Sequence, residues 1–209
     1  MKIDVISRTG EATGRSFEIA DELLLSEPNM HVVYLSVKQY LANQRQGTHK
    51  SKERNEIAGS TRKLHKQKGT GGSRKGDIKS PILHGGGRVF GPRPRDYSMD
   101  LNKKTKRLAK LAVITDLLQN NKLKVVEDFS FDAPKTKDLI SFFKTVQAEK
   151  KPLLVTSELN RNIYLSGRNI PKGAVTYVNE LNVYDMVNAD TLIVFEGAMD
   201  KIVKSLEKK

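Results

Sequence analysis

The chain has 209 residues, and its 37 Lys and Arg outnumber its 24 Asp and Glu, which gives a net charge of +13. That length suits one sizeable globular domain, and the absence of cysteine excludes disulfide frameworks and thiolate metal sites, so a reducing cytosol is the expected compartment. No apolar run approaches the roughly 18–20 residues that cross a bilayer, and no signal peptide is recognisable, so no membrane partner is expected.

The N-terminal part of the sequence predicts two short strands followed by a helix. The strands are expected over residues 2–6 and 15–19, where apolar and β-branched residues gather. Thr9-Gly10 and Thr13-Gly14 supply turn residues between them. A helix is predicted over residues 26–42, and it passes directly into a segment of very different composition.

Residues 44–95 form a strongly basic insertion. They hold fourteen basic and three acidic side chains, ten of the fifteen glycines, and only eight Ala, Val, Ile, Leu or Phe. Such a segment buries too little apolar surface to offset the entropy of ordering it. Residues 44–107 together account for the entire net charge of +13. We therefore predict a neutral globular body with a cationic insertion, whose partner is a polyanion.

Helices alternate with strands after the insertion. Every predicted strand there is a nearly continuous apolar run, which is typical of a parallel sheet covered on both faces. The sequence therefore predicts an α/β body with a mainly parallel central sheet, formed by residues 1–43 plus 100–209, and an extended loop over residues 44–99. The first expected helix after the insertion is capped by Asp100 or Asn102, opens with Lys103, Lys104, Lys106 and Arg107, and continues to Leu118. The other expected helices cover residues 134–146, 159–165, 184–187 and 198–206, and the expected strands cover 124–126, 153–156, 175–178 and 191–195.

The glycine-rich centre of the insertion, residues 66–76, has two alternative interpretations, a nucleotide-binding site of an enzyme and a flexible linker. A dinucleotide-binding fingerprint would need a glycine where Arg74 stands, and a phosphate-binding loop would need Gly-Lys-Ser/Thr where Gly76 is followed by Asp77. Neither motif lies between a strand and a helix, so we do not expect an enzyme. A flexible solvated linker is the other alternative. Turn-forming residues with apolar neighbours over 80–92 favour a more ordered loop.

The remaining side chains point to RNA contacts through phosphate and shape. His49, His65 and His84 lack the cysteine or carboxylate neighbours of a metal site. Phe90 is the only aromatic residue within 44–95, whereas modules that bind splayed single strands use several. The chemistry therefore favours a folded RNA as the polyanion.

The candidate RNA contacts are the basic side chains of the insertion and of the helix that follows it in sequence. Cations in a first helical turn oppose the helix dipole at a cost of about 0.3–1 kcal/mol each. These cations are contiguous with the insertion, which favours a phosphate-binding role, with a solvated charge cluster as the alternative. The candidates are Arg45, Lys50, Lys52, Arg54, Arg62, Lys63, Lys66, Lys68, Arg74, Lys75, Lys79, Arg88, Arg93, Arg95, Lys103, Lys104 and Arg107.

A series of motifs in fixed order identifies a family resemblance that covers essentially the whole chain. The motifs are Lys66-Gln67-Lys68-Gly69-Thr70-Gly71, Ser80-Pro81, Gly86-Gly87, Val89-Phe90-Gly91-Pro92-Arg93-Pro94-Arg95-Asp96-Tyr97, Asn102-Lys103-Lys104, Ala133-Pro134-Lys135-Thr136-Lys137 and Gly167-Arg168-Asn169. Together they resemble the family of bacterial large-subunit ribosomal protein four. His65 and Gly72-Ser73-Arg74 depart from its commoner pattern, which has an aromatic residue and an Arg-Ala-Arg run at these places.

The resemblance implies a three-layer α/β/α body and a structural, non-enzymatic role in the large (50S) subunit of cytoplasmic ribosomes. It further implies a primary 23S rRNA-binding protein that acts early in subunit assembly, with a loop that contacts several rRNA domains and forms part of the polypeptide exit tunnel wall. The tip of that loop, near the tunnel constriction, would be Gln67, Lys68, Gly69, Thr70, Gly71 and Gly72.

Partners and an alternative function follow from the same resemblance. The expected partners are 23S rRNA, other large-subunit and tunnel-lining ribosomal proteins, and the nascent polypeptide. No cofactor is expected, and any structural Mg²⁺ would be bound by rRNA rather than by the protein. Some family members also repress their own operon, so an autogenous RNA-binding repressor is the alternative function.

Overall fold

The structure is a computed structural model that describes residues 1–20, 23–148 and 150–207. The chain divides into two compact units. The first, called the body below, comprises Met1–Leu41 and Asp100–Lys209, and the second, called the loop unit, comprises Ala42–Met99. No helix within the described residues is both long and apolar enough to cross a membrane.

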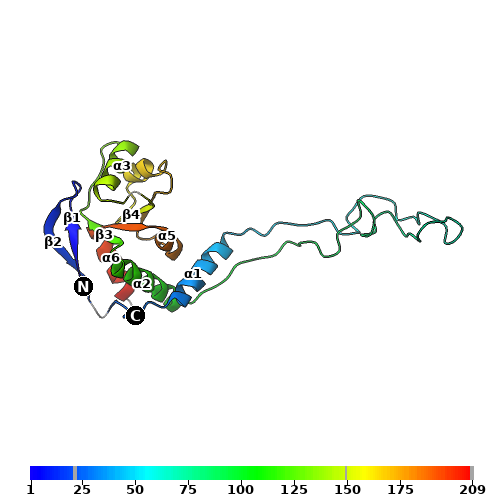
Figure 1. Cartoon of the computed structure of the whole chain (residues 1–209), viewed down its shortest axis with the longest axis horizontal. Helices are drawn as coiled ribbons and strands as arrows, with labels where there is room; N and C mark the ends of the chain where they lie inside the picture. Colours follow the sequence, from blue (N-terminus) through cyan, green and yellow to red (C-terminus); the bar gives the residue numbers. More distant parts are fainter. Residues whose placement is uncertain (21–22, 149, 208–209) are drawn as a thin grey trace. The chain divides into compact units, whose positions relative to one another are not determined.

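The described residues contain six strands and six helices, which Figure 1 shows in sequence colours. The strands are β1 (Lys2–Ile6), β2 (Ala12–Glu18), β3 (Leu123–Val126), β4 (Pro152–Thr156), β5 (Ala174–Tyr177) and β6 (Thr191–Phe195). The helices are α1 (Met30–Asn43), α2 (Lys103–Gln119), α3 (Thr136–Thr145), α4 (Arg161–Gly167), α5 (Val183–Asn188) and α6 (Glu196–Glu207).

One sheet in the order β2-β1-β3-β6-β4-β5 forms the centre of the body. Only β2 runs antiparallel to its neighbour, and β6 lies between β3 and β4, with Ile193 beside Leu154 in register. Both of these side chains are fully buried, as the predicted continuous apolar runs require. Helix α3 covers one face, and α2 and α6 cover the other (Figure 1), so the predicted three-layer α/β/α fold is confirmed.

The hairpin between β1 and β2 differs from the prediction. The turn closes where the backbone N–H of Ser7 donates to Glu11 O at 2.8 Å. Thr13 and Gly14, predicted as a second turn, lie inside β2, so that prediction was wrong. The register shifts beside them, Gly14 has φ +71°, and the Thr13 hydroxyl donates to Val5 O at 2.7 Å. Their turn-forming residues therefore make a β-bulge rather than a loop.

Two helices begin slightly later than predicted. Helix α1 starts at Met30 because the Asn29 side chain accepts hydrogen bonds from the backbone N–H groups of His31 and Val32 and acts as the N-cap. Helix α3 starts at Thr136 rather than at Pro134. The apolar stripe predicted for α3 is confirmed, since its members are all buried: Leu139, Phe142, Phe143 and Val146.

The loop unit contains no helix or strand in its described residues beyond the end of α1. Its two arms nevertheless lie side by side, because backbone N–H groups of one arm donate to carbonyl oxygens of the other (Figure 1). These bonds are Arg95 to Gly47 at 3.2 Å, Ser51 to Pro92 at 3.0 Å, Arg88 to Lys52 at 3.0 Å and Leu64 to Gly76 at 3.0 Å. The predicted ordered turns are present, and the plain solvated linker is not what the structure describes.

Candidate nucleic-acid interface

The two arms present a set of cations without internal partners. Of the fourteen basic residues predicted in the insertion, eight make no side-chain hydrogen bond, ion pair or ring contact with the rest of the described chain. Six of the eight are exposed, and Lys75 and Lys79 are half-buried. A phosphate can therefore approach them without breaking an existing contact. The eight are Lys52, Arg62, Lys66, Lys68, Arg74, Lys75, Lys79 and Arg88.

Three further basic residues that were predicted to contact RNA form ion pairs with acidic residues of the insertion. Each of the three acids pairs with one basic residue, and two of the pairs join one arm to the other. The hydrogen bond from the Lys50 ammonium is the main reason that the pKa of the Glu56 carboxyl lies below its ordinary value. The insertion thus uses its few acids to organise itself. The pairs are Lys50–Glu56, Arg54–Asp77 at 2.8 Å and Arg93–Glu53 at 2.6 Å.

Tyr97 holds the two arms together where they leave α1 and approach α2 in sequence. The guanidinium groups of Arg45 and Arg95 lie 3.7 and 4.3 Å from the centre of its ring, and its hydroxyl lies 2.9 Å from His49 Nε2. These are cation–π contacts, so both arginines support the loop's own structure. Tyr97 was placed in a family motif, but no ring contact was predicted for it, because the count of aromatic residues stopped at Arg95.

The middle of the loop unit is a packed cluster of turns, which we call the mid-loop cluster and define as residues 51–59 and 77–92. Consecutive turns close at Ser80, Leu83 and Gly86, each by a backbone hydrogen bond to a residue three positions earlier. The buried Gly87 donates to Lys79 O at 3.0 Å. This cluster therefore has a defined backbone without regular secondary structure.

The predicted loop tip is exposed and glycine-rich. The hydrogen bond from Leu64 N–H to Gly76 O closes the end of the loop, and every residue from 65 to 72 is exposed. Gly69 and Gly71 adopt φ of +85° and +66°, a region that glycine enters without steric cost. Within the tip, Gln67 accepts a hydrogen bond from Lys63. Lys68, the one basic residue of 67–72, is exposed and makes no side-chain contact with the described residues.

The candidates outside the loop unit lie on the first turns of α2 in the body. Lys103 and Lys104 are exposed, whereas Arg107 is half-buried. Lys104 and Arg107 line a pocket together with Leu108 and Leu206. Asn102 precedes the helix but makes no capping hydrogen bond through its side chain. The structure thus places a second group of cations on the body itself.

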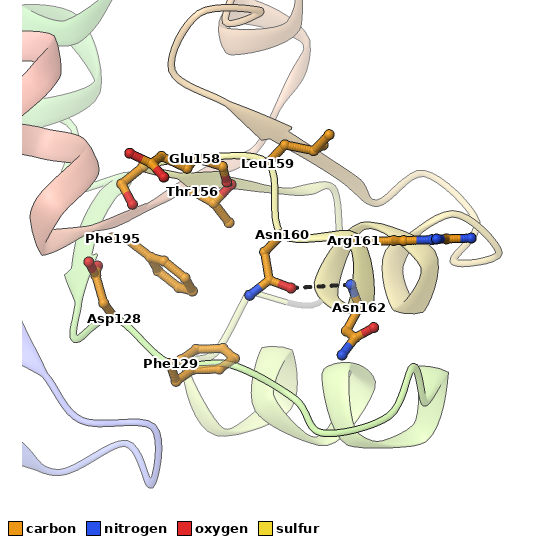
Figure 2. A pocket seen from close by; sticks show the side chains of 10 residues that line it. Asp128, Phe129, Thr156, Glu158, Leu159, Asn160, Arg161, Asn162 and Phe195 are labelled. Atoms are coloured by element: carbon orange, nitrogen blue, oxygen red, sulfur yellow. Dashed lines mark hydrogen bonds between the residues drawn. The ribbon is translucent and has the colours of Figure 1, made fainter.

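A separate pocket of about 410 Å³ lies at the carboxyl ends of β3, β4 and β6, where α/β sheets often bind ligands. Figure 2 shows the rings of Phe129 and Phe195 and the carboxyl groups of Asp128 and Glu158 around it. The hydrogen bond from the Lys201 ammonium keeps the pKa of Glu158 low, so this carboxyl stays charged. Arg161 also lines the pocket, and none of the glycine-rich residues 66–76 does, so the pocket gives no support to the nucleotide-binding alternative.

Comparison with known proteins identifies close relatives along the whole chain. The model of the "Ribosomal protein L4/L1 family" matches residues 17–205. The chain is 53% identical to "Large ribosomal subunit protein uL4" of Phocaeicola vulgatus over 203 residues, which cover 97% of this chain and 98% of the relative. It is 53% identical to the protein of that name from Parabacteroides distasonis, covering 95% and 96%, and 50% identical to that of Flavobacterium psychrophilum over the full length of both.

Proposed function

Since this chain belongs to the ribosomal protein L4/L1 family, we propose that its loop unit binds the 23S RNA of the large ribosomal subunit. Family membership makes it a structural, non-enzymatic ribosomal protein, located on the cytoplasmic ribosome. The single observation that supports RNA binding by the loop is its eight basic side chains without internal partners.

The mechanism is neutralisation of phosphates by these side chains. Each contact releases counterions from the RNA, so affinity falls as salt rises, with a log–log slope of about −0.7 to −0.9 per contact. Eight contacts give a slope of about −6 to −7. Backbone hydrogen bonds between the two arms fix the spacing of these cations. Phe90 is the only aromatic residue within 44–95, so the loop suits recognition of a folded RNA by shape rather than by base stacking.

The finer part of the proposal concerns where the protein acts. We infer a primary rRNA-binding protein of early subunit assembly, whose loop contacts several rRNA domains and reaches the wall of the polypeptide exit tunnel. The exposed tip, residues 67–72, would face the tunnel constriction, the nascent polypeptide and the tunnel-lining proteins. No cofactor of the protein is part of this proposal, and Mg²⁺ would be bound by the RNA.

Deletion of residues 50–90 tests the proposal. Affinity for 23S rRNA should fall strongly, and the salt slope should shrink because the loop phosphate contacts are gone. The matched control replaces three exposed body lysines, Lys137, Lys144 and Lys150, with Gln, which removes charge without touching the loop. Filter binding at several salt concentrations measures both. An unchanged slope after the deletion would refute RNA binding by the loop.

The cations on the first turns of α2 support a second candidate function, repression of the protein's own messenger RNA. Lys103, Lys104 and Arg107 belong to the body, so a body surface could bind RNA without the loop. A translational reporter fused to the messenger leader should then be repressed when the loop-deleted protein is overproduced. The Lys103→Ala/Lys104→Ala variant of that protein should lose repression. A reporter that ignores the loop-deleted protein would count against this function.

A further inference from the structure

We propose that the Arg54–Asp77 ion pair is a positioning lock of the loop unit rather than a phosphate contact. It fixes the two arms of the mid-loop cluster against each other, so that the unpaired cations meet the RNA as one preformed surface. The inference rests on the proposed RNA binding of the loop unit and names the residues that shape its binding surface.

Burial sets this pair apart from the other ion pairs of the chain. Asp77 is 7% exposed and is the only buried charged residue in the part of the chain that the structure describes. Arg54 donates to its Oδ2 through Nη2 at 2.8 Å and Nε at 3.2 Å, while Oδ1 has no hydrogen-bond partner among the described residues. Burial of a carboxylate with one oxygen unsatisfied is unfavourable in itself. Only the carboxylate of this pair is buried, and ion pairs that leave water add little net stability but specify one conformation in some proteins.

The two arms are in close backbone contact beside the pair. A Cβ on Gly87 would overlap the backbone N and Cα of Arg54, so the two arms are in direct backbone contact at this point. The N–H of Arg88 donates to Lys52 O at 3.0 Å immediately beside it. The pair joins residues 23 positions apart across this contact. Its loss therefore removes a side-chain link beside a point of direct backbone contact between the arms.

The competing interpretation treats Arg54 as one more phosphate contact, since its side chain is 58% exposed. The two interpretations predict opposite signs for Asp77→Asn, which has nearly the same shape and raises the loop charge by one. If Arg54 serves mainly as a phosphate contact, this variant binds RNA more tightly, with a steeper salt slope. If the pair is a lock, the variant binds about tenfold or more weakly, because the ion pair is reduced to a weaker hydrogen bond to a neutral amide and the arms separate.

Two further variants complete the binding experiment. Arg54→Lys keeps the charge but loses the planar fork, so it should weaken binding like Asp77→Asn, whereas a simple phosphate contact would tolerate it. Asp200→Asn changes the net charge equally at an exposed body position, and it should leave the affinity within about twofold of the wild type. Tighter or unchanged binding by Asp77→Asn would overturn the proposal.

A second measurement needs no RNA. The chain has no cysteine, so Ala58→Cys and Ile82→Cys place spin labels at two exposed positions, one on each arm of the mid-loop cluster. The distance distribution between the labels should be narrow with Asp77 and broad with Asp77→Asn. Equal distributions would overturn the lock. Because this result is independent of RNA, a failure of the lock is distinguishable from a failure of the RNA-binding proposal.

Discussion

The body and the loop unit obtain a defined structure in two different ways. In the body, apolar side chains on both faces of the sheet are removed from water, and most of the core residues of β4 and β6 are fully buried. In the loop unit, backbone hydrogen bonds between the arms, close glycine contacts, ion pairs and the Tyr97 ring contacts hold the chain. A segment with few apolar residues can therefore have one shape, but each polar contact contributes only about 1 kcal/mol.

The sharpest test of this comparison is a core truncation in the body. Leu154 in β4 is fully buried beside Ile193, so Leu154→Ala should lower the free energy of unfolding by about 2–5 kcal/mol. Phe90 is 99% exposed in the loop unit, so Phe90→Ala should leave the free energy of unfolding within about 0.5 kcal/mol of the wild type. Urea unfolding followed by circular dichroism measures both. Equal losses would contradict the division into two differently stabilised units.

A glycine substitution tests close backbone contact in the loop unit. Gly87→Ala should cost about 1–3 kcal/mol of RNA-binding free energy, because the new methyl overlaps the backbone of Arg54. Gly76→Ala is the matched control, since a Cβ there meets nothing within 4 Å and the residue does not adopt positive φ. Neither change should alter urea unfolding of the body. Equal affinities of the two variants would show that mid-loop packing does not matter for binding.

The Tyr97 contacts can be divided into ring and hydroxyl contributions. Tyr97→Leu removes the surface on which Arg45 and Arg95 lie and should weaken RNA binding by about 1 kcal/mol. Tyr97→Phe keeps the ring and loses only the hydrogen bond to His49, so a smaller loss is expected. Filter binding of the two variants side by side measures the difference. A larger loss for the phenylalanine variant would assign the main role to the hydroxyl.

The smallest expected effect is the response of the loop unit to pH. The pKa of Glu56 is lowered in the folded chain, mainly by its hydrogen bond from Lys50 and then by a backbone hydrogen bond, with Lys50 and Arg93 as the facing cations. A lowered carboxyl pKa stabilises the fold above the unfolded pKa, and this contribution disappears as pH falls through the folded pKa. The distribution of distances between spin labels at positions 58 and 82 should therefore stay constant from pH 8 to 5 and broaden only below about pH 4. Broadening already at pH 6 would contradict this.

Much of the body could be predicted from local pattern. The prediction for residues 191–195 coincides with β6, and the α3 stripe is buried as expected, because apolar runs and a 3.6-residue period are properties of neighbouring positions. The prediction of a turn at Thr13-Gly14 was wrong because it, too, used only neighbouring positions. Two turn-forming dipeptides stand close together there, and only pairing with Val5 decides which one becomes a bulge.

The sequence by itself determined the chemistry of the candidate interface: the location of the positive charge, the glycine content and the absence of a catalytic pattern in residues 44–95. The tertiary structure alone decided which cations remain available. Arg54 and Arg93 pair with acids 23 and 40 positions away, and Arg45 meets a ring at Tyr97. Charge and glycine counts are summed along a sequence, whereas these contacts depend on two distant arms approaching within hydrogen-bonding distance. That approach is a property of the folded loop.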